Sequence, residues 1–167
     1  MHKLCLIISV SCLLACNSES TKTLEEIASL EAKLAEQPSQ QILQELLVLY
    51  QGMATKSNDG QRLDYLWKAG ETARAARDFQ TAESIFKELY EKNKGTDLAA
   101  KSLFLHAFMC DEDLKDYDKA RGLYQDFLTA YPDSDFSDDA QFLLDNLGKT
   151  DEEMLELLSK SRPESEQ

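Results

Sequence analysis

The sequence lacks several patterns that define common protein classes. None of its apolar runs reaches the ~20 residues that a membrane-spanning helix needs, and no stretch alternates apolar and polar residues for long enough to predict a strand. Basic residues are also few, since 18 lysines and arginines stand against 31 acids and give a net charge of −13. This balance argues against nucleic acid as a partner, because binding phosphate requires the opposite charge.

The chain starts with the pattern of an export signal. Lys3 gives the first residues a positive charge, and an apolar run follows over residues 4–14. The run is about half as long as a spanning helix, and a polar stretch begins at Asn17. We therefore predict a signal peptide over residues 1–15.

The end of this run, Leu-Leu-Ala-Cys at residues 13–16, resembles the bacterial lipobox. The resemblance implies that Cys16 carries lipid, that residues 16–23 form a tether, and that the protein is held to a bilayer without spanning it. Asn17 after the cysteine favours the outer membrane, facing the periplasm. The alternative is an ordinary secretory signal in which Cys16 is only a small apolar residue.

The chain beyond the predicted signal is acidic and poor in cysteine. Its 152 residues suffice for one domain, and 17 basic against 31 acidic residues give a net charge of −14. Cys110 is the one cysteine left there after lipidation, so no internal disulfide is possible and packing must stabilise the fold. Residues 111–153 hold 14 acids and four bases. Solvated helix faces explain this excess, and a basic partner or loosely held calcium is the alternative.

Apolar residues recur at helical spacing from residue 24 onward and predict an all-α fold. Thr23 and Glu26 form a capping-box pattern, and Pro38 followed by Ser39 separates two helices within residues 24–56. A further helical pair is predicted over 135–158. The tail, 159–167, has no core-forming residue and is predicted to be disordered.

An internal repeat lies between these segments. The stretch RDFQTAESIFKELY from Arg77 aligns with KDYDKARGLYQDFL from Lys115, and six apolar pairs keep their register. Each unit is predicted to be two helices joined by a short turn, over 61–94 and 97–132. Ala82 and Ala120 are the small residues that let two helices approach closely.

These units resemble tetratricopeptide repeats, and the resemblance implies an antiparallel helix-hairpin solenoid. Large, small and aromatic residues fall where that family places them, except that Phe108 stands where a small residue is expected. The period, from Arg77 to Lys115, is also slightly longer than the one typical of that family, and we expect the excess near Asn93 to Thr96. The phrase from Tyr117 to Gly148 is similar to repeats in bacterial envelope lipoproteins, including those of outer-membrane barrel assembly.

In that family the first helix of each unit lines a groove that holds a partner's peptide or helix. Carried over by position, the lining residues are Asp64, Trp67, Glu71, Arg74, Leu105, Met109 and Glu112. Trp67, Leu105 and Met109 would form an apolar strip rimmed by charge, as binding patches do. The alternative places these three side chains in the core.

Residues for catalysis are scarce. His106, Cys110 and Asp113 follow one another at helical spacing, but three weak ligands on one helix are a poor metal site, and neither they nor a cysteine–histidine pair predict an enzyme. No cofactor is predicted. The sequence favours a membrane-anchored scaffold of the bacterial cell envelope that binds other envelope proteins. An assembly-factor subunit for outer-membrane proteins, a structural spacer and a metal or thiol enzyme are the alternatives.

Overall fold

Helices form all the regular structure in the residues that the computed structural model describes, which are 4–150, 152–153 and 155–156, with side chains from residue 20 onward. The all-α prediction is therefore confirmed. The chain divides into two compact units, Met1–Asp78 and Phe79–Gln167. The first predicted repeat, 61–94, draws one helix from each unit.

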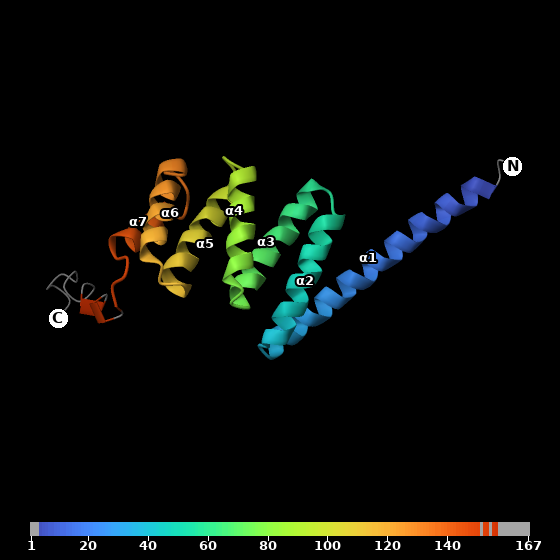
Figure 1. Ribbon diagram of the computed structural model, residues 1–167, viewed down its shortest axis with the longest axis horizontal. Helices are drawn as coiled ribbons and strands as arrows, with labels where there is room; N and C mark the ends of the chain where they lie inside the picture. The colour runs from blue at the N-terminus through green and yellow to red at the C-terminus, as the bar shows by residue number, and fades with distance from the viewer. Residues whose placement is uncertain (1–3, 151, 154, 157–167) are drawn as a thin grey trace, which may run out of the picture. The chain divides into compact units, whose positions relative to one another are not determined.

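The first unit contains α1 (Leu4–Glu36), α2 (Gln40–Lys56) and α3 (Asp59–Ala75), shown in Figure 1. Because α1 continues through Thr23 and Glu26, the prediction that these residues start a helix is wrong. The break at Pro38 is confirmed, although Ser39 makes no capping hydrogen bond through its side chain. Among the described residues no helix combines the length and the apolar character needed to cross a bilayer.

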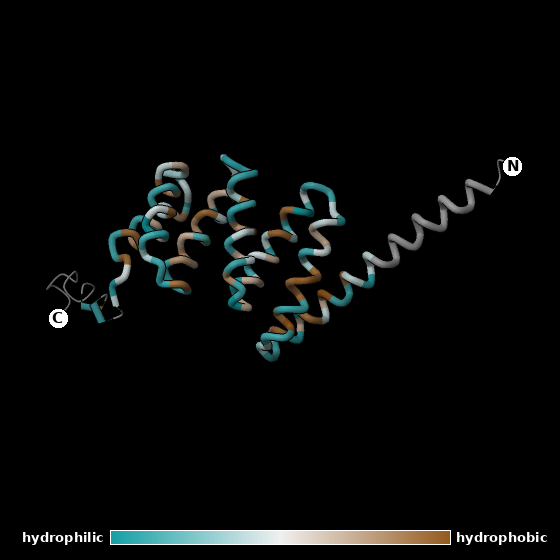
Figure 2. The backbone as a smooth tube through the Cα atoms, viewed as in Figure 1, coloured by the Kyte–Doolittle hydropathy of each residue, from teal (hydrophilic) through white to brown (hydrophobic). Residues whose placement is uncertain are grey.

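Glu31 ties the three helices of this unit together. Its carboxylate accepts hydrogen bonds from the Tyr50 hydroxyl on α2 and from Lys68 Nζ on α3, the latter at 2.8 Å. These bonds, that of Lys68 first, hold the pKa of Glu31 below its usual value. Around them, buried apolar residues fill the space between helices, and Figure 2 shows hydrophobic segments where α1 and α2 meet. The first unit is thus a three-helix packing arrangement.

The second unit contains α4 (Phe79–Lys92), α5 (Asp97–Phe108), the π-helical turn η1 (Met109–Asp113), α6 (Tyr117–Ala130) and α7 (Ser137–Asp145). Of these, α5 packs against both α4 and α6, and α6 also packs against α7. Phe104 of α5 lies at the centre of an aromatic group, with ring centroids 5.0 Å from Phe136 and 5.7 Å from Phe127. The core of the unit is therefore built around α5.

The helix boundaries repeat with the offset found in the sequence. Asn58 and Thr96 are both N-caps whose side chains accept a hydrogen bond from a backbone N–H in the first turn of the helix. Helices α4 and α6 begin at the aligned residues Phe79 and Tyr117 and have 14 residues each. Within them the same positions are fully buried: Ala82, Phe86, Leu89, Ala120, Tyr124 and Phe127. Local structure and burial therefore follow the repeat.

In each of the two repeats, the turn between the helices contains a residue other than glycine in the left-handed conformation. Arg77 has a φ of 59° and Lys115, its counterpart in the repeat, a φ of 54°. In the first turn Asp78 N donates to Ala73 O, which is the bond of a Schellman helix end. In the second turn Asp116 N donates to Cys110 O, six residues back instead of five, because the hydrogen bonds of the π-helical turn span one residue more than those of an α-helix.

The C-terminal pair is described only in part. After α7 the chain turns at Gly148, whose φ of +78° favours glycine. A capping box is present at Thr150 and Glu153, since Thr150 N donates to Glu153 Oε2 and Glu153 N donates to Thr150 Oγ1. Residues 157–158 of the predicted pair and the tail 159–167 lie outside the described residues.

Candidate protein-binding site

The first half of the predicted groove lies on α3. Its four residues, Asp64, Trp67, Glu71 and Arg74, follow one another at intervals of three and four and so share a stripe of the helix. Asp64 and Glu71 are exposed, whereas Trp67 and Arg74 are half-buried. This stripe therefore presents two acidic side chains and part of a large aromatic one.

The second half, on α5 and η1, differs from the prediction at Met109. Glu112 is exposed and pairs with Lys115 at 3.1 Å, and Leu105 is half-buried against the core of the unit. Met109, expected to line the groove, is 0% exposed. It continues the buried stripe of Ser102 and His106, so the alternative of a core position is correct for this residue.

The sequence contains a signal for the burial of Met109, but the assignment of groove residues by their position in the repeat does not use it. Residues of α5 are apolar nearly all the way round the helix, and a helix of that kind is enclosed on most sides by its neighbours. An open groove face requires polar residues along one stripe. Of the three residues of the predicted apolar strip, only Trp67 and Leu105 are therefore partly accessible.

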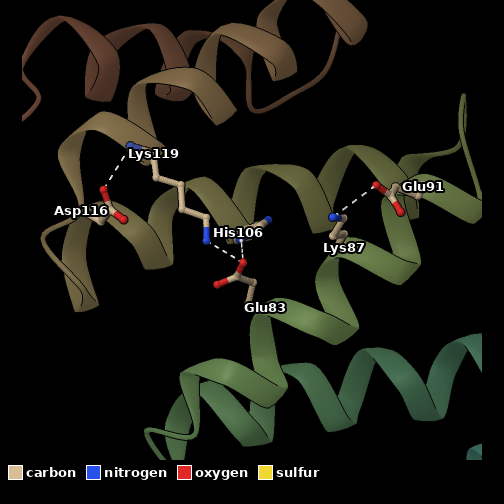
Figure 3. Close-up of polar contacts among 6 residues, drawn as sticks. All are labelled: Glu83, Lys87, Glu91, His106, Asp116 and Lys119. Carbon is tan, nitrogen blue, oxygen red and sulfur yellow. Dashed lines mark hydrogen bonds and ion pairs between the residues drawn. The ribbon is translucent and has the colours of Figure 1, made fainter.

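A polar cluster that the sequence did not reveal joins three helices of the second unit (Figure 3). Lys119 Nζ on α6 donates to Glu83 Oε1 on α4 at 2.6 Å. His106 Nε2 on α5 lies 3.9 Å from the same oxygen, which is too far for a hydrogen bond. The bond from Lys119 is the main reason that the pKa of Glu83 is below its usual value.

His106 itself is an unusual core residue. Its side chain is 2% exposed, it stacks on Tyr90 with ring centroids 6.1 Å apart, and neither ring nitrogen has a hydrogen-bond partner within the described part of the chain. Burial lowers its pKa to about 4, although the nearby Glu83 acts in the opposite direction. The imidazole is therefore neutral at neutral pH.

Cys110 and His106 do not form a reactive pair. The thiol is free and fully buried, and burial raises its pKa to about 11, so it stays protonated at neutral pH. A nucleophilic cysteine requires the opposite shift. For the residues that are described, no three histidine, cysteine, aspartate or glutamate side chains come together as a metal site requires.

The fold and the buried pattern define this chain as an all-α protein of helix-hairpin repeats. Residues 101–134, which cover most of α5, the π-helical turn and α6, match the tetratricopeptide repeat family. The chain thus contains a tetratricopeptide repeat, a module that binds other proteins and that typically acts as a scaffold rather than an enzyme. No curated protein and no solved structure matches the chain significantly.

Proposed function

We propose that this protein is a lipid-anchored scaffold of the bacterial cell envelope that holds partner proteins near the membrane. The observation that carries the binding function is the tetratricopeptide match, because it coincides with a hairpin whose buried residues on α6 recur at the aligned positions of α4. The lipobox at residues 13–16 supports the anchor, and Asn17 supports the outer membrane facing the periplasm. The side chain of Cys16 lies outside the described residues.

The anchor is tested by changing Cys16 to serine and following the protein in bacterial membranes. We expect the unchanged chain to incorporate radiolabelled palmitate and to sediment with the outer membrane. Cys16→Ser is expected to lose both properties, because several acyl chains are needed for stable attachment. Cys12→Ser is the matched control and should change neither. Label that persists in Cys16→Ser would disprove lipidation at this residue.

Partner binding is tested by affinity capture of the full chain from detergent-solubilised membranes. The α3 stripe is altered by Asp64→Lys with Glu71→Lys, which reverses two exposed charges without touching the core. A matched control, Glu25→Lys with Glu45→Lys, makes the same change of charge at exposed positions of α1 and α2. We expect the α3 variant alone to lose specific partners. Equal capture of partners by both variants would show that the α3 stripe is not part of the binding surface.

The same experiment separates the general scaffold from the narrower alternative of an outer-membrane assembly factor. That alternative rests on the resemblance of residues 117–148 to repeats of envelope lipoproteins. It predicts that an integral β-barrel protein co-purifies in stoichiometric amount with the anchored chain. Capture of other envelope proteins without such a barrel protein would favour the general scaffold.

A further inference from the structure

Two adjoining cavities lie at the loop edge of the second unit, and none of the residues predicted to line the groove is among their lining residues. One, of about 430 Å³, is bounded by the start of α5 and the loop from α6 to α7. The other, of about 490 Å³, is bounded by the end of α4, α5 and the end of α6. They share Gly95, Ala130 and Tyr131, and each falls in the size range of ligand sites.

The loop that forms this edge is held by its own hydrogen bonds. Tyr131 ends α6, and its backbone oxygen accepts from Ser134 N at 3.2 Å and from Ser137 Oγ at 2.8 Å. Phe136 stacks on the core residue Phe104 with 5.0 Å between ring centroids. The walls of the first cavity are therefore fixed before any ligand arrives, which lowers the entropy cost of binding.

The two cavities differ in chemistry. The 430 Å³ cavity carries Asp97, Asp133 and Asp135 but only one basic side chain, Lys101. All three aspartates are exposed, and none of them pairs with a base on the described residues. The 490 Å³ cavity balances Lys94 against Asp126, and its wall is mainly apolar. Among the apolar residues of that wall are Tyr90, Leu103, Ala130 and Tyr131.

We infer that these cavities form one groove for an extended basic peptide, with an apolar side chain in the 490 Å³ cavity and a lysine or arginine among the three aspartates. Charge complementarity selects this occupant, because an acidic segment would meet three unpaired carboxylates of the same sign. The inference rests on the proposed protein-binding function and states the chemistry of the partner. The peptide lies along the loop edge, where the α4–α5 and α6–α7 loops meet Tyr131.

The test measures fluorescence anisotropy of a labelled hexapeptide that alternates lysine and leucine, added to the full chain in a non-ionic detergent. Asp133→Asn with Asp135→Asn removes two of the three carboxylates. This double substitution should weaken binding by about fivefold or more, because two exposed ion pairs are lost together, although each one contributes little by itself. The control, Asp138→Asn with Asp139→Asn, removes the same charge from exposed positions on α7 and should change binding less than about twofold.

Two further measurements make the outcome decisive. Ala130→Trp fills the junction shared by both cavities from an exposed position at the end of α6 and should abolish binding. A hexapeptide that alternates glutamate and leucine should not bind. Equal weakening by the two charge variants, binding that survives Ala130→Trp, or no binding of the lysine peptide would each overturn the groove. If membrane partners are still captured in that event, the proposed scaffold function stands and only this groove fails.

Discussion

Replacing His106 by leucine is expected to remove most of the pH dependence of stability between pH 7 and pH 5. The native imidazole has a pKa of about 4, whereas 6.5 is the ordinary value that it recovers on unfolding. Between these values the unfolded chain binds a proton that the native chain does not. The free energy of unfolding therefore falls as the pH falls through this window.

The magnitude follows from the two pKa values. Each unit of difference corresponds to about 1.4 kcal/mol, so complete titration would cost about 3 kcal/mol, of which about 2 kcal/mol is lost between pH 7 and pH 5. Solvent does not reduce this figure much, because the side chain is 2% exposed. Leucine has a similar volume and no titrating group. At pH 7 it should also stabilise the chain by about 1 kcal/mol, because the two unpaired ring nitrogens disappear.

The assay is urea unfolding followed by far-ultraviolet circular dichroism at pH 7 and pH 5, for the native sequence and for His106→Leu. Glu83→Gln is the control, because it removes the neighbouring carboxylate but leaves the imidazole in place, and its pH dependence should remain. An NMR titration of the imidazole gives the native pKa directly. An equal loss of stability in the native sequence and in His106→Leu, or an imidazole pKa above about 6, would refute the reasoning.

Three other predictions concern packing and turns in the second unit, each measured as a change in the free energy of unfolding. Ala120→Leu should destabilise the chain by about 1–3 kcal/mol, because Ala120 is fully buried and the added atoms overpack the core. An unchanged free energy of unfolding would mean that space exists beside α6. Gly122→Ala, on the same helix with open space around it, should instead stabilise by about 0.5–1 kcal/mol through lower backbone entropy in the unfolded chain. Lys115→Gly should stabilise the chain by about 0.5 kcal/mol, because the relief of left-handed backbone strain exceeds the loss of the exposed ion pair with Glu112. A loss of stability would show that the ion pair contributes more than the strain costs.

The repeat was predictable because helical hairpins depend on local spacing. The register predicts Ala82 and Ala120 as the small residues at helix contacts, and both are fully buried, as are the aligned aromatic residues Phe86 and Tyr124. Helix starts at Phe79 and Tyr117 also follow from short patterns of caps and turn residues. These features need no knowledge of distant contacts. The capping pattern at Thr23 misled for the same reason, because a local signal does not prevent a helix from continuing through it.

The exposure of the predicted groove residues was harder to predict, because it depends on which faces of a helix become covered. Helical spacing puts Leu105 and Met109 on neighbouring positions, but Met109 lies in the π-helical turn, which packs against α6, and is covered completely, whereas Leu105 on α5 is covered only in part. A groove inferred by position therefore requires a test of exposure for each residue. Asp64, Glu71 and Glu112 pass that test, and these charged residues, rather than the apolar strip, are the better positions for mutagenesis.

His106 shows a further limit of sequence reasoning. Glu83, His106 and Lys119 are too far apart in the chain to form a local pattern, yet they come together because three helices pack side by side. Lys119 reaches Glu83 at 2.6 Å and leaves the imidazole without a hydrogen bond to that carboxylate. Burial holds the only histidine beyond the predicted signal neutral in the core, and this side chain adds to the acid sensitivity that Glu31 and Glu83 give the fold through their lowered pKa values. The free energy of unfolding is therefore expected to decrease as the pH falls from 6.5 to about 4, because over this range the unfolded chain binds a proton at His106 that the folded chain does not.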